Sequence, residues 1–303
     1  MKRILSLAIV AALAAGSFAA APEESSFAAE AAAFGKVLDI WPEGKMPGDA
    51  PSGPEILAPG RPYRDFIYRN VSHPTLTVRR APGDGVHPAM LICPGGGYFM
   101  LAWRLEGMEI AEWANSIGMD AFILKYRVPG DGSVALMDAQ RAVSWMRHNA
   151  KELKIDPDKI AQIGFSAGAN LTARTAGSFK SRKYEPVDEA DSSSSRPDAT
   201  LLIYPAGLFK GGFLARPDRD MTLDGLNAVT RETPPAFLTQ TEDDFCMVEN
   251  CIAYYLACKR SGVNAAMLLA PKGGHGYGMR PTGRDNDTWP EVAAAWLKRT
   301  LGF

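Results

Sequence analysis

The 303-residue sequence has almost no excess of either charge and is poor in cysteine and histidine. Its 33 basic and 34 acidic residues give a net charge of −1. Because the two signs are mixed along the chain, no basic stripe can bind a phosphate backbone, so we expect no nucleic-acid partner. The four cysteines match no zinc-site spacing, so we expect no metal. No repeat with a period of 20–50 residues is visible, which excludes a solenoid.

The sequence also lacks an apolar run of the ~20 residues that a membrane span needs. Lys2 and Arg3 precede a shorter apolar stretch at residues 4–15, and small residues follow at 17 and 19–21. This order is typical of a signal peptide, which we predict at residues 1–21. We therefore expect a secreted or periplasmic protein without stable membrane insertion.

Export would place the cysteines in an oxidising compartment. Cys246 and Cys251 are close enough in sequence to pair, whereas burial as free thiols is an equally good prediction for all four, including Cys93 and Cys258. The sequence does not decide between these alternatives.

The alternation of apolar runs predicts the fold class. Residues 22–60 are rich in Ala, Gly and Pro and read as an N-terminal arm, and residues 61–303 read as one domain. Short strands are expected at 66–71, 75–80, 89–93, 121–124, 160–163, 201–204, 236–238 and 266–269, and helices at 105–117, 136–146, 248–260 and 289–301. Most strands lack polar alternation and alternate with helices, which indicates an α/β protein with a mostly parallel sheet between two helical layers. The punctuated stretch 206–233 is a candidate small cap, and 180–197 a surface loop.

Gly164-Phe165-Ser166-Ala167-Gly168 places a serine between an expected strand and an expected helix. A serine hydroxyl is a weak nucleophile and must be exposed beside a base, which a sharp strand–turn–helix achieves. The alternative is a helix-capping serine in a glycine-rich turn. Ser166 is the candidate nucleophile.

Pro94-Gly95-Gly96-Gly97 ends an earlier strand. A glycine run can aim several backbone N–H groups at one point, which suits the negative oxygen formed during acyl transfer. We therefore predict an oxyanion hole made by the N–H groups of Gly96, Gly97 and Ala167. Taken alone, the segment could be a plain tight turn.

A base and an acid follow Ser166 along the chain. His275 lies in a glycine-rich loop after the last expected strand, whereas the other histidines lie in turns or within a helix. Glu242, Asp243 and Asp244 follow the strand at 236–238; we favour Asp244 as the acid, then Asp243, then Glu242. A solvated acidic loop is the alternative.

Five segments, at 92–98, 124–127, 138–142, 164–168 and 273–276, together resemble secreted bacterial acetylxylan-esterase-like α/β hydrolases, which are related to hormone-sensitive-lipase-like and feruloyl-esterase-like hydrolases. The resemblance implies the α/β-hydrolase fold, a Ser166–His275–Asp244 triad and oxyanion donors at Gly96, Gly97 and Ala167. The sequence departs from the family pattern in two places: Ala169-Asn170 replaces Gly-His after the nucleophile, and Pro94 replaces a histidine before the glycine run.

The expected function is hydrolysis of a carboxylic ester, with deacetylation of xylan or other acetylated saccharides as the favoured reaction and no cofactor. Alternatives on the same scaffold are a feruloyl esterase, a short-chain lipid esterase or a peptidase; from another class, a non-catalytic binding protein remains an alternative. Trp41, Tyr98 and Trp103 are candidates for a sugar cleft, although packing in the core is the commoner role of such residues. The sequence does not predict the oligomeric state.

Overall fold

The computed structural model describes residues 22–60, 65–211 and 215–303. The expected signal peptide at 1–21 lies outside the described residues, as do 61–64 and 212–214. A large sheet has the strand order β1-β4-β7-β5-β8-β9-β10-β11. Its strands are β1 (Lys36–Asp39), β4 (Thr75–Arg79), β5 (His87–Cys93), β7 (Asp120–Lys125), β8 (Ile155–Phe165), β9 (Ala199–Ile203), β10 (Ala236–Thr241) and β11 (Ala265–Ala270). The pairs from β7 to β11 are parallel, and β4 and β1 are antiparallel to their neighbours.

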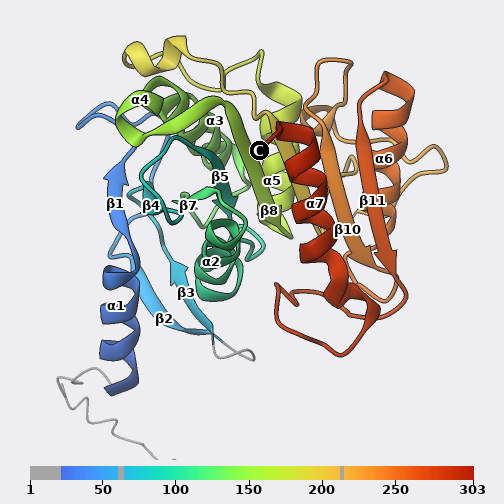
Figure 1. Ribbon diagram of the computed structural model, residues 1–303, viewed down its shortest axis with the longest axis horizontal. Coiled ribbons are helices and arrows are strands. Elements are labelled where there is room, and N and C mark those ends of the chain that lie inside the picture. The colour runs from blue at the N-terminus through green and yellow to red at the C-terminus, as the bar shows by residue number, and fades with distance from the viewer. Residues whose placement is uncertain (1–21, 61–64, 212–214) are drawn as a thin grey trace, which may run out of the picture.

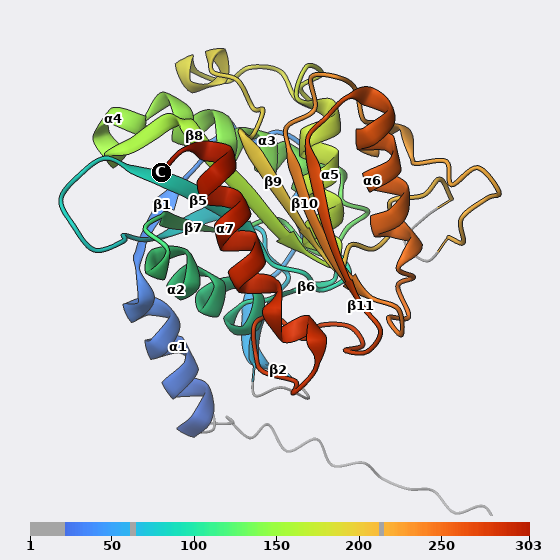
Figure 2. The same ribbon diagram turned by 45° about the vertical axis from the view of Figure 1, so that its right-hand side comes forward.

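Helices cover both faces of this sheet, as Figures 1 and 2 show. One face carries α2 (Glu109–Ser116) and α7 (Trp289–Leu301), and the other carries α3 (Ser133–His148), α5 (Ala167–Ser178) and α6 (Glu249–Ser261). The short helix α4 (Ala150–Leu153) follows α3. The predicted three-layer α/β arrangement with a mostly parallel sheet is therefore confirmed.

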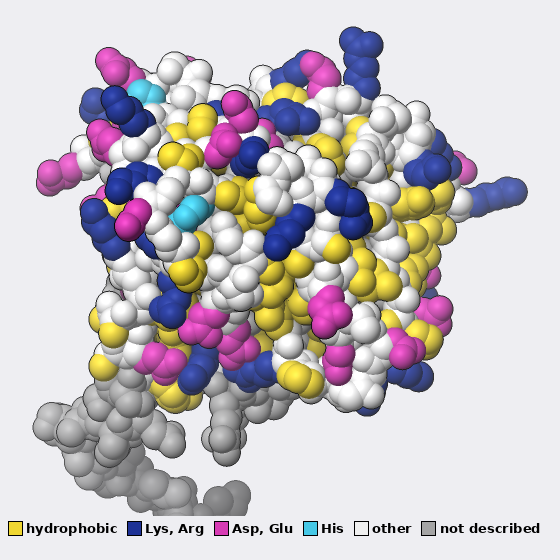
Figure 3. Space-filling view, viewed as in Figure 1, with side chains coloured by type: hydrophobic (Ala, Val, Ile, Leu, Met, Phe, Trp, Pro, Cys, Tyr) yellow, Lys and Arg dark blue, Asp and Glu magenta, His cyan; other side chains and the backbone are white. Residues whose placement is uncertain are grey.

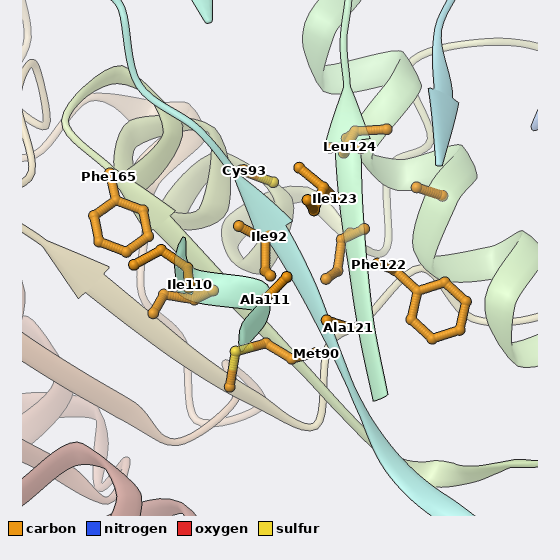
Figure 4. Packing of buried hydrophobic residues seen from close by; sticks show 14 of the residues in the cluster. Met90, Ile92, Cys93, Ile110, Ala111, Ala121, Phe122, Ile123, Leu124 and Phe165 are labelled. Carbon is orange, nitrogen blue, oxygen red and sulfur yellow. The ribbon is translucent and has the colours of Figure 1, made fainter. Parts of the chain in front are cut away.

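The core lies between the sheet and these helices. Phe122 and Ile123 of β7 are both fully buried and point to opposite sides of the sheet (Figure 4). This is the reason that the central strands are apolar without alternation, since each of their faces meets a helical layer. Met90 and Ile92 of β5 pack near Ile110 of α2 on one of those faces (Figure 4).

The N-terminal part is more ordered than the sequence suggested. Residues 22–60 contain α1 (Pro22–Phe34), β1 and β2 (Ile56–Gly60), whereas no periodic element was expected there. β1 completes the edge of the large sheet, and β2 forms a second, antiparallel sheet with β3 (Asp65–Arg69) and β6 (Met100–Ala102). Short exposed strands such as β1 carry too weak an apolar pattern to be read from sequence.

The helix expected at 105–117 is divided in two. Its first turn is a five-residue π-helix, Arg104–Met108, which leads directly into α2. Such wide turns are rare and occur often at functional sites. The described residues contain no helix that is both long and apolar enough to cross a membrane. On the face seen in Figure 3, positive and negative side chains are interspersed, in line with the net charge.

Candidate active site

Ser166 occupies a sharp turn between β8 and α5. Its backbone has φ +52° and ψ −114°, a conformation that L-residues rarely adopt. The flanking glycines are required by close approach: a Cβ on Gly164 would lie 2.0 Å from the Gly168 carbonyl oxygen, and one on Gly168 would lie 2.0 Å from that of Cys93. The glycine–serine–glycine spacing therefore has a steric cause, and it presents the hydroxyl at the carboxyl end of the sheet.

His275 and Asp244 meet Ser166 at that same edge. Ser166 Oγ lies 2.8 Å from His275 Nε2, and His275 Nδ1 lies 2.9 and 2.8 Å from the two carboxylate oxygens of Asp244. When His275 Nδ1–H donates a hydrogen bond to Asp244, Nε2 is left to accept the hydrogen bond from the Ser166 hydroxyl. The structure thus brings the three predicted side chains, from the loops after β8, β10 and β11, into one hydrogen-bonded chain.

The adjacent acids have separate contacts. Asp244 is buried and also accepts hydrogen bonds from the Cys246 N–H (2.7 Å) and Gln240 Nε2 (3.0 Å). Asp243 is exposed, and its Oδ1 accepts from the N–H groups of Gly273 and Gly274 at 3.0 and 2.8 Å. These bonds, that from Gly274 foremost, hold the pKa of Asp243 below its usual value. Asp243 therefore shapes the loop that carries His275, whereas Asp244 contacts the imidazole.

The glycine run lies beside the serine. Gly96 (φ +132°) and Gly97 (φ +65°) both have left-handed backbone and both line the same pocket as Ser166. Among the described residues, the N–H groups of Gly96, Gly97 and Ala167 donate no hydrogen bond, so all three are available to a ligand. Gly95 has no room for a side chain, because a Cβ there would lie 2.6 Å from the Phe165 carbonyl oxygen.

A cavity of about 580 Å³ opens beside Ser166 and His275. Its wall comes mainly from β2, β3, β6 and the π-helix: Pro59, Gly60, Asp65, Ile67, Arg69, Met100, Ala102, Leu105 and Glu106, with Phe245, Cys246 and Gly276 completing it. No described residue of 206–233 lines it. The wall of this pocket is therefore formed by the small sheet and the π-helix, and a cap role of 206–233 stays a prediction.

The three aromatic residues suggested for a sugar cleft pack in the core. Trp41 donates a 2.8 Å hydrogen bond to buried Asp138, Tyr98 donates one of 2.8 Å to Asn170, and Trp103 packs edge-on against Tyr68. Asn170, which departs from the family pattern described above, accepts the bond from Tyr98 and donates one of its own to the Gly207 carbonyl oxygen at 2.7 Å. The departure from the family pattern thus makes a structural link behind the nucleophile.

Glu106 is a site residue that the sequence did not reveal. Its carboxylate is buried, lines the pocket, and accepts hydrogen bonds from the Gly95 N–H (2.7 Å) and the Tyr204 hydroxyl (2.8 Å). The Tyr204 hydroxyl in turn accepts from the Gly278 N–H at 3.0 Å, and its ring packs against His275. Glu106 therefore connects the glycine run with the loop of the histidine.

The π-helix that presents Glu106 is fixed at its start. Asp65 Oδ1 accepts from the N–H groups of Arg104 and Leu105 at 2.9 and 3.0 Å. Burial raises the pKa of Asp65 to about 6 and that of Glu106 to about 7. Two carboxyl groups of this pocket therefore have pKa values close to neutral pH.

Glu106→Gln is expected to change how stability depends on pH. Because burial raises the folded-state pKa from 4.5 to about 7, the folded protein holds this proton more tightly than the unfolded chain. Wild-type stability therefore falls as pH rises from about 4.5 to about 7, by on the order of 3 kcal/mol from this group. Glutamine keeps the shape without the charge. The free energy of unfolding, measured in urea, should therefore rise for the variant relative to wild type by about that amount between pH 5 and pH 8.

Exposed Glu112, on α2, provides the matched control for this measurement. Glu112→Gln should leave the difference between pH 5 and pH 8 unchanged. If the free energies of unfolding of Glu106→Gln and wild type change equally with pH across this range, Glu106 does not carry the buried charge.

The cysteines are all reduced, and one of them lies beside His275 and Asp244. All four cysteines are buried and free, so Cys246 and Cys251 do not form the disulfide considered above. Asp244, Cys246 and His275 have potential ligand atoms within 4.8 Å of one another. Asp244, however, contacts Nδ1, whereas Cys246 Sγ lies 3.8 Å from Nε2. The two approach different nitrogens of the ring, which suits a hydrogen-bonded chain better than a single ion.

A nucleophile turn at the end of a central parallel strand, with its histidine and acid on later loops, defines an α/β hydrolase. The family model described as "alpha/beta hydrolase fold" matches residues 90–220. The crystal structure of an acetyl ester-xyloside bifunctional hydrolase from Caldicellulosiruptor lactoaceticus is similar, with a TM-score of 0.72 and 30% identity over 89% of this chain and 97% of that one. The chain belongs to the α/β hydrolases, in their acetylxylan-esterase-like group.

Two curated relatives support the same placement. An acetylxylan esterase from Xylanibacter ruminicola is 29% identical over 233 residues, covering 69% of this chain and 45% of that protein. An endo-1,4-beta-xylanase B from Butyrivibrio fibrisolvens is 34% identical over 212 residues, covering 64% of this chain and 33% of that protein. The chain thus spans less than half the length of these two relatives.

Proposed function

We propose that this chain is a serine carboxylic-ester hydrolase that removes acetyl groups from xylan or other acetylated saccharides. The observation that carries the proposal is the hydrogen-bonded series Ser166–His275–Asp244 at the edge of an open pocket. The names of the relatives, which act on acetyl esters or xylan, support the choice of substrate.

The proposed mechanism uses Ser166 as nucleophile and His275 as base. Ser166 Oγ attacks the acetyl carbonyl carbon while His275 Nε2 takes the hydroxyl proton, and Asp244 stabilises the imidazolium without being protonated itself. His275 then gives the proton to the departing sugar oxygen, leaving an acetyl group on Ser166. A water molecule, deprotonated by His275, then attacks the acetyl carbonyl carbon; the bond to Ser166 Oγ breaks, His275 returns the proton to Oγ, and acetate is released.

Backbone N–H groups would stabilise the negative charge that develops on the carbonyl oxygen. Gly96, Gly97 and Ala167 have unused N–H groups beside the nucleophile, and Glu106 holds the preceding Gly95 in place. Donors that are fixed before the reaction need no reorganisation when the charge forms. We assign these three residues to the oxyanion hole, and the mechanism as a whole uses only side chains, backbone and water.

The proposal extends to the organisation of the chain. We propose residues 1–21 as a signal peptide, 22–60 as an N-terminal arm and 61–303 as the catalytic domain, in a secreted or periplasmic protein. Such a location would suit a polymeric substrate that does not enter the cell.

A substrate panel tests the proposal. Purified protein should release acetate from acetylated xylo-oligosaccharides and hydrolyse p-nitrophenyl acetate, with a far lower kcat/KM on a feruloyl ester, a short-chain glyceride and a peptide. Activity confined to one of the last three would replace the substrate by that class. If no ester or peptide is cleaved while a saccharide still binds, a non-catalytic binding protein becomes the better account.

A further inference from the structure

Two large aromatic side chains near the pocket are exposed to solvent. Phe99 is 74% exposed and Phe245 is 70% exposed, whereas most aromatic residues of the chain are buried. Phe245 lines the catalytic pocket, and its ring centroid lies 4.8 Å from that of His275. Covering such a ring is favourable, so an exposed aromatic at the mouth of a pocket offers apolar contact area to a ligand there.

The surface is hollowed again beyond Phe245. A second hollow of about 450 Å³ is lined by Arg216, Pro217, Phe245, Met247 and Glu249. Because Phe245 lines both hollows, it forms the rim between them. A ligand that lies across this rim would have one part beside Ser166 and the next part beside Arg216 and Glu249.

The lining of the second hollow suits a sugar better than an acyl chain. Arg216 is exposed and Glu249 is half-buried, and within the described residues neither side chain is engaged in an ion pair or a hydrogen bond. They offer a donor and an acceptor to hydroxyl groups, while the flat Phe245 ring offers an apolar face to the C–H side of a pyranose. Unpaired charges of both signs would instead have to be desolvated by an alkyl chain.

The size of the catalytic pocket also favours an extended ligand. An acetyl group needs only a small part of a cavity of about 580 Å³, so the sugar that bears the ester also has room there. In an oligosaccharide, the neighbouring sugar can then extend over the rim that Phe245 forms between the two hollows.

We propose that Phe245, with Arg216 and Glu249, forms a subsite for a sugar unit that neighbours the acetylated one. The inference rests on the proposed function and deepens it, because it makes the enzyme selective for acetylated oligosaccharides over isolated small esters. The ring of Phe245 supplies stacking area, and the two charged side chains hydrogen-bond the sugar hydroxyls.

Phe245→Leu tests the subsite, since leucine keeps apolar contact with His275 but removes the flat face. Stacking of this kind contributes about 0.5–1.5 kcal/mol, so kcat/KM on an acetylated xylotriose should fall up to about 10-fold. The loss should lie mainly in KM, and the ratio of kcat/KM on acetylated xylotriose to kcat/KM on p-nitrophenyl acetate should fall, because only the oligosaccharide is long enough to cross the rim. Phe99→Ala provides the matched control, because Phe99 is equally exposed but lines neither hollow; its ratio of the two activities should equal that of wild type.

A binding measurement separates failure of the subsite from failure of the proposed function. Calorimetry of Ser166→Ala with deacetylated xylotriose should show binding that the added Phe245→Leu change weakens. Equal affinity in both proteins, or no binding at all, overturns the subsite whatever the esterase assays show. Equal losses of Phe245→Leu on both esters also overturn it, as does a loss confined to long-chain acyl esters. Absence of all ester hydrolysis in wild type overturns the proposed function, while the calorimetry still decides the subsite.

Discussion

Ser166→Ala is expected to lower kcat on p-nitrophenyl acetate by about 10⁶-fold, the scale seen when a triad serine is removed. The Ser166 hydroxyl is the group that His275 Nε2 contacts at 2.8 Å, and water would have to replace it without the same fixed position. KM should change little, because the pocket wall is made by other residues. The measurement is steady-state kinetics corrected with blanks that contain no enzyme. Thermal unfolding should show that the variant remains folded.

Ser178→Ala provides a matched control at the other end of the same helix. Its hydroxyl donates to the Arg174 carbonyl oxygen and lies away from the described pocket lining. Its kcat should stay within about twofold of wild type, since such a change costs little beyond one local hydrogen bond. If Ser166→Ala keeps more than a few per cent of wild-type kcat, Ser166 is not the nucleophile.

The second large effect is expected from Asp244→Asn, which should lower kcat by about 10⁴-fold. An asparagine amide facing Nδ1 would favour the imidazole tautomer with its proton on Nε2, so His275 could no longer accept the proton of Ser166. The side chain is buried and also holds the Cys246 N–H and Gln240. Asparagine keeps an acceptor for one of these contacts, so the fold should survive.

Asp243→Asn is the matched comparison, because it changes the neighbouring residue in the same way. Its side-chain oxygen can still accept hydrogen bonds from the N–H groups of Gly273 and Gly274. Because the position is also exposed, we expect kcat to fall by less than about 10-fold. The opposite order, with Asp243→Asn the more damaging change, would mean that the histidine loop moves and that Asp243 orients the base.

The sequence predicted those parts of the structure that depend on local pattern. Strands such as β5 and β7 are continuous apolar runs because both faces of the sheet are buried, and the glycines around Ser166 are required by backbone contacts a few residues away. His275 could be found because it is the one histidine in a glycine-rich loop after the last strand. In these cases the cause of the structure lies close to the residue itself.

Other features depend on contacts between distant parts of the chain. Glu106 is in an ordinary helical pattern, and its partners Gly95, Tyr204 and Gly278 meet it only in the folded protein. The sequence alone allowed Trp103 to line a cleft, whereas in the fold it is buried and packs against Tyr68 of β3. The sequence favoured Asp244 over Asp243, but the contact of Asp244 with the imidazole is seen only in the fold, because consecutive residues in a turn point in different directions.

The most direct test of the account is covalent labelling with a fluorophosphonate, which reacts with a serine activated by a neighbouring base. Peptide mass spectrometry should find one adduct per chain, on Ser166, with no adduct in Ser166→Ala and much slower labelling in Asp244→Asn. An adduct on a different serine, or ester hydrolysis that continues undiminished without any labelling of Ser166, would contradict the central claim.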